Sequence, residues 1–166
     1  MSAMERLGSM DLTWLQIERA TNRMHVTGLL IFETPLERAH LEAVLRSRLL
    51  RLERFGQHVL RDSVGAVWES DTVILADHVV TATLPPSQDE RAALEALVGQ
   101  LASTPLEPSR PLWQLHLVET YKGGSALIAR VHQCIADSIA LFSVLRSLTD
   151  DTPTADTPPP PAAAVQ

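Results

Sequence analysis

Residues 112–138 read LWQLHLVETYKGGSALIARVHQCIADS, and this stretch predicts two paired strands followed by a helix. Apolar and polar residues alternate over 112–119, as on a strand with one face in a core. The turn Lys122-Gly123-Gly124 predicts a hairpin, and the apolar run 125–132 predicts its return strand. A helix then begins at Asp137 or Ser138. The sequence therefore predicts an antiparallel ladder that carries the end of the return strand into a turn before the helix.

The chain before this hairpin is predicted to alternate helices and strands. The expected elements are a helix over 10–18 capped by Ser9, a strand over 24–32, a helix over 37–50, strands over 57–60, 66–69 and 78–84, and a helix opened by the capping-box pattern Ser87-Gln88-Asp89-Glu90. The strand over 24–32 carries apolar residues on both faces by its end, which indicates a strand buried on both sides. A mixed, largely antiparallel sheet flanked by helices accounts for this order.

The composition of the chain argues against nucleic-acid binding and against a membrane-spanning helix. The chain has 166 residues and a net charge of -6, so a basic face for nucleic acid is not expected. No run of about 20 apolar residues is present that could span a bilayer, and a cytoplasmic location is expected. The composition changes after residue 150, where Pro158 to Pro161 lie in a short tail. We expect one domain over 1–150 and a disordered Pro/Ala-rich linker or tail over 151–166.

The turn between the return strand and the final helix holds the residues best suited to chemistry. His132 ends the strand and Asp137 lies where the helix begins, so both belong to one turn. An imidazole, with a pKa of about 6.5, can act as a general base. Gln133 cannot, because an amide does not titrate in this range, and a lost general base typically costs about 10²- to 10⁴-fold in rate. His132 and Asp137 are therefore candidate catalytic positions, and Gln133 joins them only through the family resemblance of this turn.

Each of these residues also has a structural interpretation. On strict strand alternation His132 points with Arg130 and opposite to Gln133, so it replaces a lost base only if the strand ends in a bulge. Otherwise His132 is a buried, hydrogen-bonded histidine that supports the loop. Asp137 is expected as a plain N-cap. Cys134, the single cysteine, forms no internal disulfide, and no neighbour in sequence would activate it as a nucleophile.

This turn resembles the active-site motif of acyl-CoA-dependent acyltransferases, which reads His-His-x-x-x-Asp-Gly. His132 and Asp137 match it, whereas Gln133 stands at the second His, the general base of that family, and Ser138 stands at the Gly. The resemblance extends to the N-terminal half of bacterial wax ester synthase/diacylglycerol acyltransferases and separates the chain from peptide-synthetase condensation domains, which share the motif and the general fold. The segments that carry it are Ser9-Met10-Asp11 through Trp14, 24–33, Arg110-Pro111-Leu112-Trp113, 115–119, and Ser147-Leu148-Thr149-Asp150.

The resemblance implies a chloramphenicol-acetyltransferase-like α/β half. It also implies acyl transfer from acyl-CoA, a substrate rather than a cofactor, to a long-chain alcohol or diacylglycerol, with no metal. Substrate contacts are implied at Pro111, Leu112, Trp113 and Ser138. Core packing is the alternative for Trp113, because it follows a proline on an alternating strand. Members of the family often associate peripherally with membranes or lipid droplets.

Three departures from the family pattern shape the expected function. Gln133 replaces the base, Ser138 replaces the glycine, and a C-terminal half is absent from this sequence. The chain is therefore expected to be inactive alone, or to work with a C-terminal half supplied as a second chain. The alternatives are a non-catalytic acyltransferase-like protein that binds lipid, acyl-CoA or a partner, and a decayed gene product without a selected role.

Overall fold

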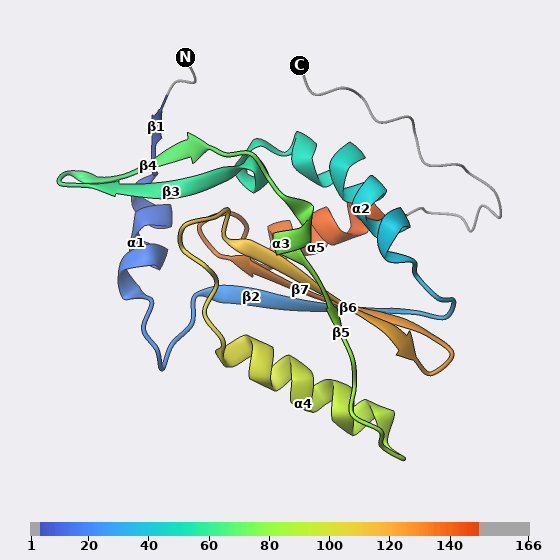
Figure 1. Cartoon of the computed structure of the whole chain (residues 1–166). Helices are drawn as coiled ribbons and strands as arrows, with labels where there is room; N and C mark the ends of the chain where they lie inside the picture. The colour runs from blue at the N-terminus through green and yellow to red at the C-terminus, as the bar shows by residue number, and fades with distance from the viewer. Residues whose placement is uncertain (1–3, 150–166) are drawn as a thin grey trace.

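A four-stranded sheet lies at the centre of the structure, a computed structural model that describes residues 4–149 (Figure 1). In chain order the elements are β1 (Glu5–Arg6), α1 (Ser9–Ile17), β2 (His25–Phe32), α2 (Arg38–Ser47), the 3-10 turns η1 (Leu49–Arg51) and η2 (Glu53–Gly56), β3 (Gln57–Asp62), β4 (Gly65–Ser70), α3 (Leu75–His78), β5 (Val79–Ala82), α4 (Glu90–Ser103), β6 (Trp113–Tyr121), β7 (Gly124–His132) and α5 (Ser138–Leu148). The predicted tail lies outside the described residues, so the domain boundary at 150 stays a prediction.

The central sheet has the strand order β2-β7-β6-β5, in which only the β5–β6 pair is parallel. This confirms the predicted mixed, largely antiparallel sheet and the hairpin of residues 112–132. Lys122 and Gly123 form the turn with positive φ angles of 48° and 82°. Strand β2 pairs with β7 over its whole length, from His25 opposite His132 to Phe32 opposite Ser125.

The β2–β7 pair leaves no space for a side chain at Gly124, beside the hairpin turn. A Cβ on Gly124 would lie 1.9 Å from the carbonyl oxygen of Phe32, which is a backbone atom and cannot swing away. The hydroxyl of Ser125 reinforces this end, because it donates to Glu119 and accepts from the N–H of Leu36. Glycine is therefore required at 124 for the two strands to meet there.

Helices cover both faces of this sheet (Figure 1). α4 packs on one face, where Leu94 and Leu101 meet Val118 and Ile128. α2 and α5 pack on the other, where Leu41, Leu45, Leu141 and Leu145 join the largest buried cluster with Leu115, Leu117, Leu127 and Ala129. The apolar side chains of all three helices thus lie in the core.

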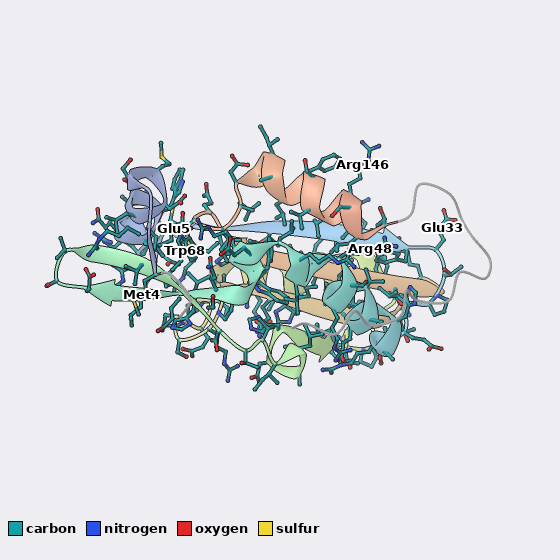
Figure 2. All side chains as sticks on the ribbon, turned by 90° about the horizontal axis from the view of Figure 1, so that it is seen from above. Met4, Glu5, Glu33, Arg48, Trp68 and Arg146 are labelled. Atoms are coloured by element: carbon teal, nitrogen blue, oxygen red, sulfur yellow. The ribbon has the colours of Figure 1, made fainter. Side chains whose placement is uncertain are left out.

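A second sheet of three strands, in the order β1-β4-β3, lies beyond one end of the first, beside α1 (Figures 1 and 2). Leu15 of α1 and Trp68 of β4 pack there with Leu112 and Cys134. Trp68 and Glu5 mark this end in Figure 2, and Glu33 marks the opposite end. The small sheet therefore forms a wall beside the end of β7.

The prediction that the strand over 24–32 is buried on both sides was wrong. β2 is an edge strand, and its Leu29 and Ile31 are 43% and 58% exposed. Both residues lie on the face that carries α4, because Leu29 pairs with Ile128, but α4 covers mainly the strands further in. Apolar alternation alone does not distinguish a central strand from an edge whose side chains lack a cover.

Helix boundaries needed smaller corrections. α1 begins at Ser9 itself, and Gly8 is the N-cap. α4 is capped by Asp89, whose carboxylate accepts from the N–H of Ala92, so Ser87 is not the cap. Glu90 does not close a capping box but accepts from the N–H of Lys122 in the hairpin turn. The predicted helix over 37–50 ends at residue 47, and the predicted strand over 78–84 pairs only from 79 to 82.

Candidate functional site

The motif turn is fixed by backbone hydrogen bonds to both neighbours of β7. The N–H of His132 donates to Leu112 O at 2.9 Å, and the N–H of Gln133 donates to Met24 O at 2.8 Å. The N–H groups of Ile135 and Ala136 then donate back to the carbonyl of His132. The turn is thus held between the starts of β2 and β6, and its side chains have defined directions.

His132 is a buried residue that points away from position 133. It is 1% exposed, and its Nδ1 accepts from the N–H of Cys134 at 3.1 Å. Burial lowers the pKa of His132, although the carboxylate of Glu18 opposes this effect. The neutral ring therefore carries its proton on Nε2, which lies 3.4 Å from Glu18 Oε2. This geometry supports His132 as a buried histidine that stabilises the loop, and not as a general base.

Gln133, Asp137 and Ser138 lie on the accessible side of the turn. Gln133 is half-buried, whereas Asp137 and Ser138 are exposed. Asp137 Oδ1 accepts from the N–H of Ala140 at 2.8 Å, which confirms the predicted N-cap of α5. Ser138 is the first residue of α5 and lines a groove beside β2.

Pro111, Leu112 and Trp113 are all buried. Trp113 is 2% exposed, its indole N–H donates to Phe55 O at 2.8 Å, and its ring stacks on His78 at 4.2 Å. This is the packing role given as the alternative for Trp113. Leu112 also contacts the cluster below α1, and it lines a small pocket there. The structure thus separates these three buried residues from the exposed Ser138, although the family resemblance implied substrate contacts at all four.

A mainly apolar groove lies beside Ser138. It has a volume of about 630 Å³ and runs between β2 and α5. Its lining is formed by Val26, Thr27, Gly28, Leu29, Leu30, Ser138, Leu141, Phe142, Leu145, Arg146 and Thr149. Phe142 is 70% exposed and Leu29 43%, so the groove is open to an apolar ligand or surface.

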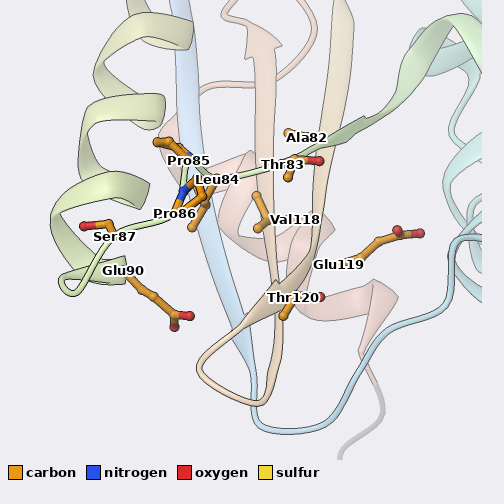
Figure 3. Close-up of a pocket in the computed structure, with 10 residues that line it drawn as sticks. All are labelled: Ala82, Thr83, Leu84, Pro85, Pro86, Ser87, Glu90, Val118, Glu119 and Thr120. Atoms are coloured by element: carbon orange, nitrogen blue, oxygen red, sulfur yellow. The ribbon is translucent and has the colours of Figure 1, made fainter.

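A second pocket lies at the other end of the sheet, between the segment after β5 and the end of β6 (Figure 3). It has a volume of about 370 Å³, and Thr83, Glu90 and Glu119 are among its lining residues. Glu90 is engaged with the backbone of Lys122, as described above. Neither a histidine nor a residue of the motif turn lines this pocket.

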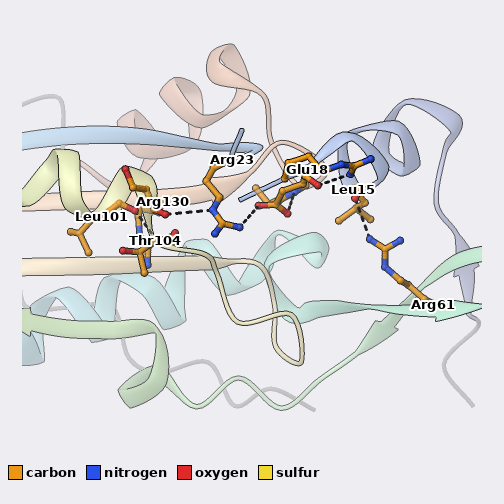
Figure 4. Close-up of polar contacts among 10 residues, drawn as sticks. Leu15, Glu18, Arg23, Arg61, Leu101, Thr104 and Arg130 are labelled. Carbon is orange, nitrogen blue, oxygen red and sulfur yellow. Dashed lines mark hydrogen bonds and ion pairs between the residues drawn. The ribbon is translucent and has the colours of Figure 1, made fainter. Parts of the chain in front are cut away.

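A basic cluster that was not predicted from the sequence lies under the motif turn and is formed by His25, His116, Arg130 and His132. Arg130 is 1% exposed, and its guanidinium donates to Leu101 O, Thr104 O and Gln114 Oε1 (Figure 4). It therefore caps the C-terminal end of α4, where cations are favourable. Burial lowers the pKa of His116 to about 4, and Arg130 adds to this shift. An arginine in an apolar strand was the signal that could have revealed the cluster.

Several nitrogen atoms of this cluster lack hydrogen-bond partners. Both ring nitrogens of His25 and Nε of Arg130 are buried and unpartnered within residues 4–149. Burial also lowers the pKa of His25, with Arg130 as the next cause. Unsatisfied buried polar atoms are rare in stable folds and tend to mark places retained for another reason.

Cys134 and metal chemistry receive no support from the geometry. Burial raises the pKa of the Cys134 thiol to about 12, so the thiolate that a nucleophile requires is disfavoured. Among the described residues, no group of three His, Cys, Asp or Glu side chains could hold a metal ion. Within the same range, no helix is long and apolar enough to cross a membrane.

Comparison with known proteins places this geometry in a family. The family described as "Wax ester synthase/diacylglycerol acyltransferase catalytic domain" matches residues 7–166. The Mycobacterium tuberculosis protein named "Probable diacyglycerol O-acyltransferase tgs3" is 33% identical over 156 residues, which is 89% of this chain and 57% of that protein. The chain therefore spans little more than half of that relative.

Solved structures show the fold. The wax ester synthase/diacylglycerol acyltransferase from Marinobacter aquaeolei VT8 superposes with a TM-score of 0.76 at 24% identity, over 96% of this chain and 40% of that one. The starter condensation domain of rhizomide synthetase RzmA, in a mutant complexed with C8-CoA, gives 0.75 at 17% identity, over 89% of this chain and 35% of that one. The fold alone does not separate the two kinds of protein, whereas the sequence matches do. By those matches, the chain belongs to the wax ester synthase/diacylglycerol acyltransferase family.

Proposed function

We propose that this chain supplies the motif half of an acyl-CoA-dependent O-acyltransferase and has no turnover by itself. The observation that carries the proposal is the direction of the motif side chains. Gln133 occupies the position of the family's base, and His132 is buried with Nδ1 engaged by Cys134. On the accessible side of the motif turn, an amide thus stands at the position of the base, and the Asp137 carboxylate is engaged as the N-cap of α5.

The groove between β2 and α5 is the proposed site of the fatty acyl chain. It starts beside Ser138, at the motif turn, and follows β2 for residues 26–30, a length on the order of 15 Å. Its volume of about 630 Å³ lies within the usual range for small-molecule sites. An acyl chain in this groove would bring its thioester to the motif turn, where an acceptor alcohol or diacylglycerol has to meet it.

A second polypeptide or segment is proposed to complete the acceptor side. The described residues give the groove one strand and one helix as walls, and Phe142 is exposed at its rim. Catalysis requires that both reactants be held in a defined geometry, and an open groove does not hold them. The partner we propose resembles the part of the tgs3 protein that lies beyond its match to this chain. Peripheral contact with a membrane or lipid droplet and a cytoplasmic location fit this proposal.

The test is the variant Gln133→His, assayed for thiol release from a long-chain acyl-CoA with a long-chain alcohol. The chain is mixed with the non-matching part of the tgs3 protein. We expect the rate to rise about 10²- to 10⁴-fold over the unchanged chain, because a general base is restored. Gln133→Asn is the matched control, since it changes the side chain without adding a base.

The rate comparison also separates the two parts of the proposal. Equal rates for Gln133→His and Gln133→Asn in the mixture would contradict the role of position 133. Full activity of the unchanged chain alone would contradict the need for a partner.

The groove also favours a second candidate, a non-catalytic protein that binds acyl-CoA or lipid. Apolar Leu29 and Phe142 are exposed at its rim, so an acyl chain can bind without any reaction at position 133. In that case the isolated chain binds a long-chain acyl-CoA in calorimetry, Phe142→Ser weakens the binding, and Gln133→His gains no activity in the mixture.

A further inference from the structure

A carboxylate faces the motif turn from behind, on the side of His132 and not of Gln133. Glu18 is the C-cap residue of α1, and its Oε2 lies 3.4 Å from Nε2 of the buried His132. Its other oxygen, Oε1, lies 4.0 Å from Nη1 of Arg23 (Figure 4). Glu18 does not line the groove between β2 and α5. Any effect of Glu18 on a ligand in that groove therefore has to pass through His132.

The two ring nitrogens of His132 make different contacts. Nδ1 accepts from the backbone N–H of Cys134 at 3.1 Å, so Nδ1 carries no proton. Burial lowers the pKa of His132, whereas the charge and the hydrogen bond of Glu18 raise it. The neutral ring has its single proton on Nε2, the nitrogen that faces Glu18. The carboxylate favours this tautomer, because it is the acceptor for the Nε2 proton.

This tautomer determines how the turn after His132 is held. With the proton on Nδ1, the ring would present a donor to the N–H of Cys134, and the hydrogen bond between them would be lost. Gln133 lies between these two residues, and its own N–H donates to Met24 O at 2.8 Å. The direction of the side chain at position 133 therefore depends on contacts made by the residues on both sides of it.

Glu18 is fixed by contacts of its own. Arg19 Nη1 donates to the carbonyl of Glu18 at 2.7 Å, and Arg23 Nε donates to Ser103 O at 3.4 Å, at the end of α4. Leu15, one turn earlier in α1, packs in the same cluster as Cys134. The carboxylate thus comes from a helix end that packs beside the turn, as expected of a residue that supports a site without entering it.

We propose that Glu18 is a positioning residue of the motif turn. It holds His132 in the tautomer with the proton on Nε2, and His132 then fixes Cys134 and the direction of the side chain at position 133. The effect of Glu18 on acyl transfer rests on the proposed function, whereas its effect on the tautomer does not.

The first test is nitrogen NMR of the His132 ring in the full chain, at about pH 7. We expect a protonated Nε2 and an unprotonated Nδ1 in the wild type. Glu18→Ala should bring the other tautomer into exchange, and the amide proton of Cys134 should then exchange with solvent at least tenfold faster. Glu18→Gln should keep the wild-type tautomer, because its side-chain oxygen still accepts from Nε2.

Glu42→Ala is the matched control for this measurement. The side chain of Glu42 is 20% exposed, close to the 25% of Glu18, and its partners Arg38 and Arg46 lie on its own helix. A wild-type ring protonated on Nδ1, or a tautomer that Glu18→Ala leaves unchanged, would overturn the inference. An equal change in Glu42→Ala would also overturn it, because the signal would then report on overall stability.

The second test measures thiol release in the Gln133→His background, mixed with the non-matching part of the tgs3 protein. Glu18→Ala should lower kcat about 10- to 100-fold with KM unchanged, because a displaced base loses its alignment while the acyl chain still binds. Glu18→Gln should restore most of kcat. A change in KM alone, or equal losses of kcat in both Glu18 variants, would contradict the positioning role. If Gln133→His itself shows no turnover, the proposed function fails, and the NMR result still decides the role of Glu18.

Discussion

The two ends of the β2–β7 pair differ in what they contribute. At the hairpin end, Gly124 meets the backbone of Phe32 with no space for a side chain. The Ser125 hydroxyl there donates to Glu119 O and accepts from the N–H of Leu36. At the motif end, His25 and Arg130 are buried with nitrogen atoms that lack partners. One continuous ladder thus combines an end built for stability with an end that carries a polar cost. Folds keep such costs mainly where a site requires them, which agrees with the site proposed at the motif turn.

The largest effect on the free energy of unfolding is expected from Gly124→Ala, which changes the hairpin end. The new Cβ would lie 1.9 Å from Phe32 O, so the backbone of one strand has to move. We expect a loss of more than about 4 kcal/mol in the free energy of unfolding, measured in urea. Gly99→Ala in α4 is the control, because nothing lies within 4 Å of its Cβ position, and it should stabilise by about 0.5–1 kcal/mol. A loss below about 1 kcal/mol for Gly124→Ala would show that this end is not tight.

Acid should weaken the motif end next. The pKa of His116 is lowered to about 4 by burial first and by Arg130 second, so the folded state holds the neutral ring. The unfolded chain binds the proton more readily. The stability from His116 is therefore fully present above pH of about 6.5 and lost as the pH falls from there toward 4. The loss is about 3 kcal/mol.

The measurement is urea unfolding at pH 7 and pH 4 for the wild type and for His116→Gln. The variant keeps a group that can donate to Gln114, the partner of His116, but cannot be protonated in this range. We expect the variant to lose less stability than the wild type over the same pH interval, since other groups titrate equally in both. Identical losses of stability in the two proteins would show that protonation of His116 does not cause the acid effect.

A smaller effect is expected between the two ends, at Gly28. A Cβ there would lie 2.8 Å from Leu145 Cδ1, a flexible side-chain atom of α5. Gly28→Ala should therefore cost about 1–3 kcal/mol in the free energy of unfolding, through overpacking of α5 on β2. Adding Leu145→Val shortens the side chain and should recover part of this loss. Strictly additive effects in the double variant would mean that the two residues are not in contact.

The sequence predicted the central hairpin well because turn chemistry and alternation agree there. Gly123 and Gly124 supply the turn and the close approach, and the residues of 112–119 alternate as a strand with a core face. The predicted cap at Asp137 was confirmed for the same reason, since a cap depends on residues only three positions apart. Local signals thus sufficed wherever the structure depends on local contacts.

Features that depend on distant residues were not predictable in this way. The edge position of β2 depends on which strands pair. Its apolar residues therefore predicted a strand buried on both faces, whereas Leu29 and Ile31 are exposed. The basic cluster depends on Arg130 reaching the end of α4, some 26 residues earlier in the chain. The role of Glu18 beside His132 likewise has no signature in the spacing of the sequence. The sequence thus names candidate residues on one turn, but it does not reveal the distant residues that contact them.

The pairing of β2 with β7 also has a consequence during synthesis on the ribosome. Strand β2 ends at Phe32 and β7 at His132, so residues 33–132 are made after β2 before its partner strand is complete. At about 5–20 residues per second, this takes roughly 5–20 seconds. During that time the apolar edge of β2 has no strand beside it, and unpaired edges of this kind aggregate. The nascent chain should therefore depend on chaperones that hold it until β7 emerges, and its yield should rise when translation and folding are matched in the host.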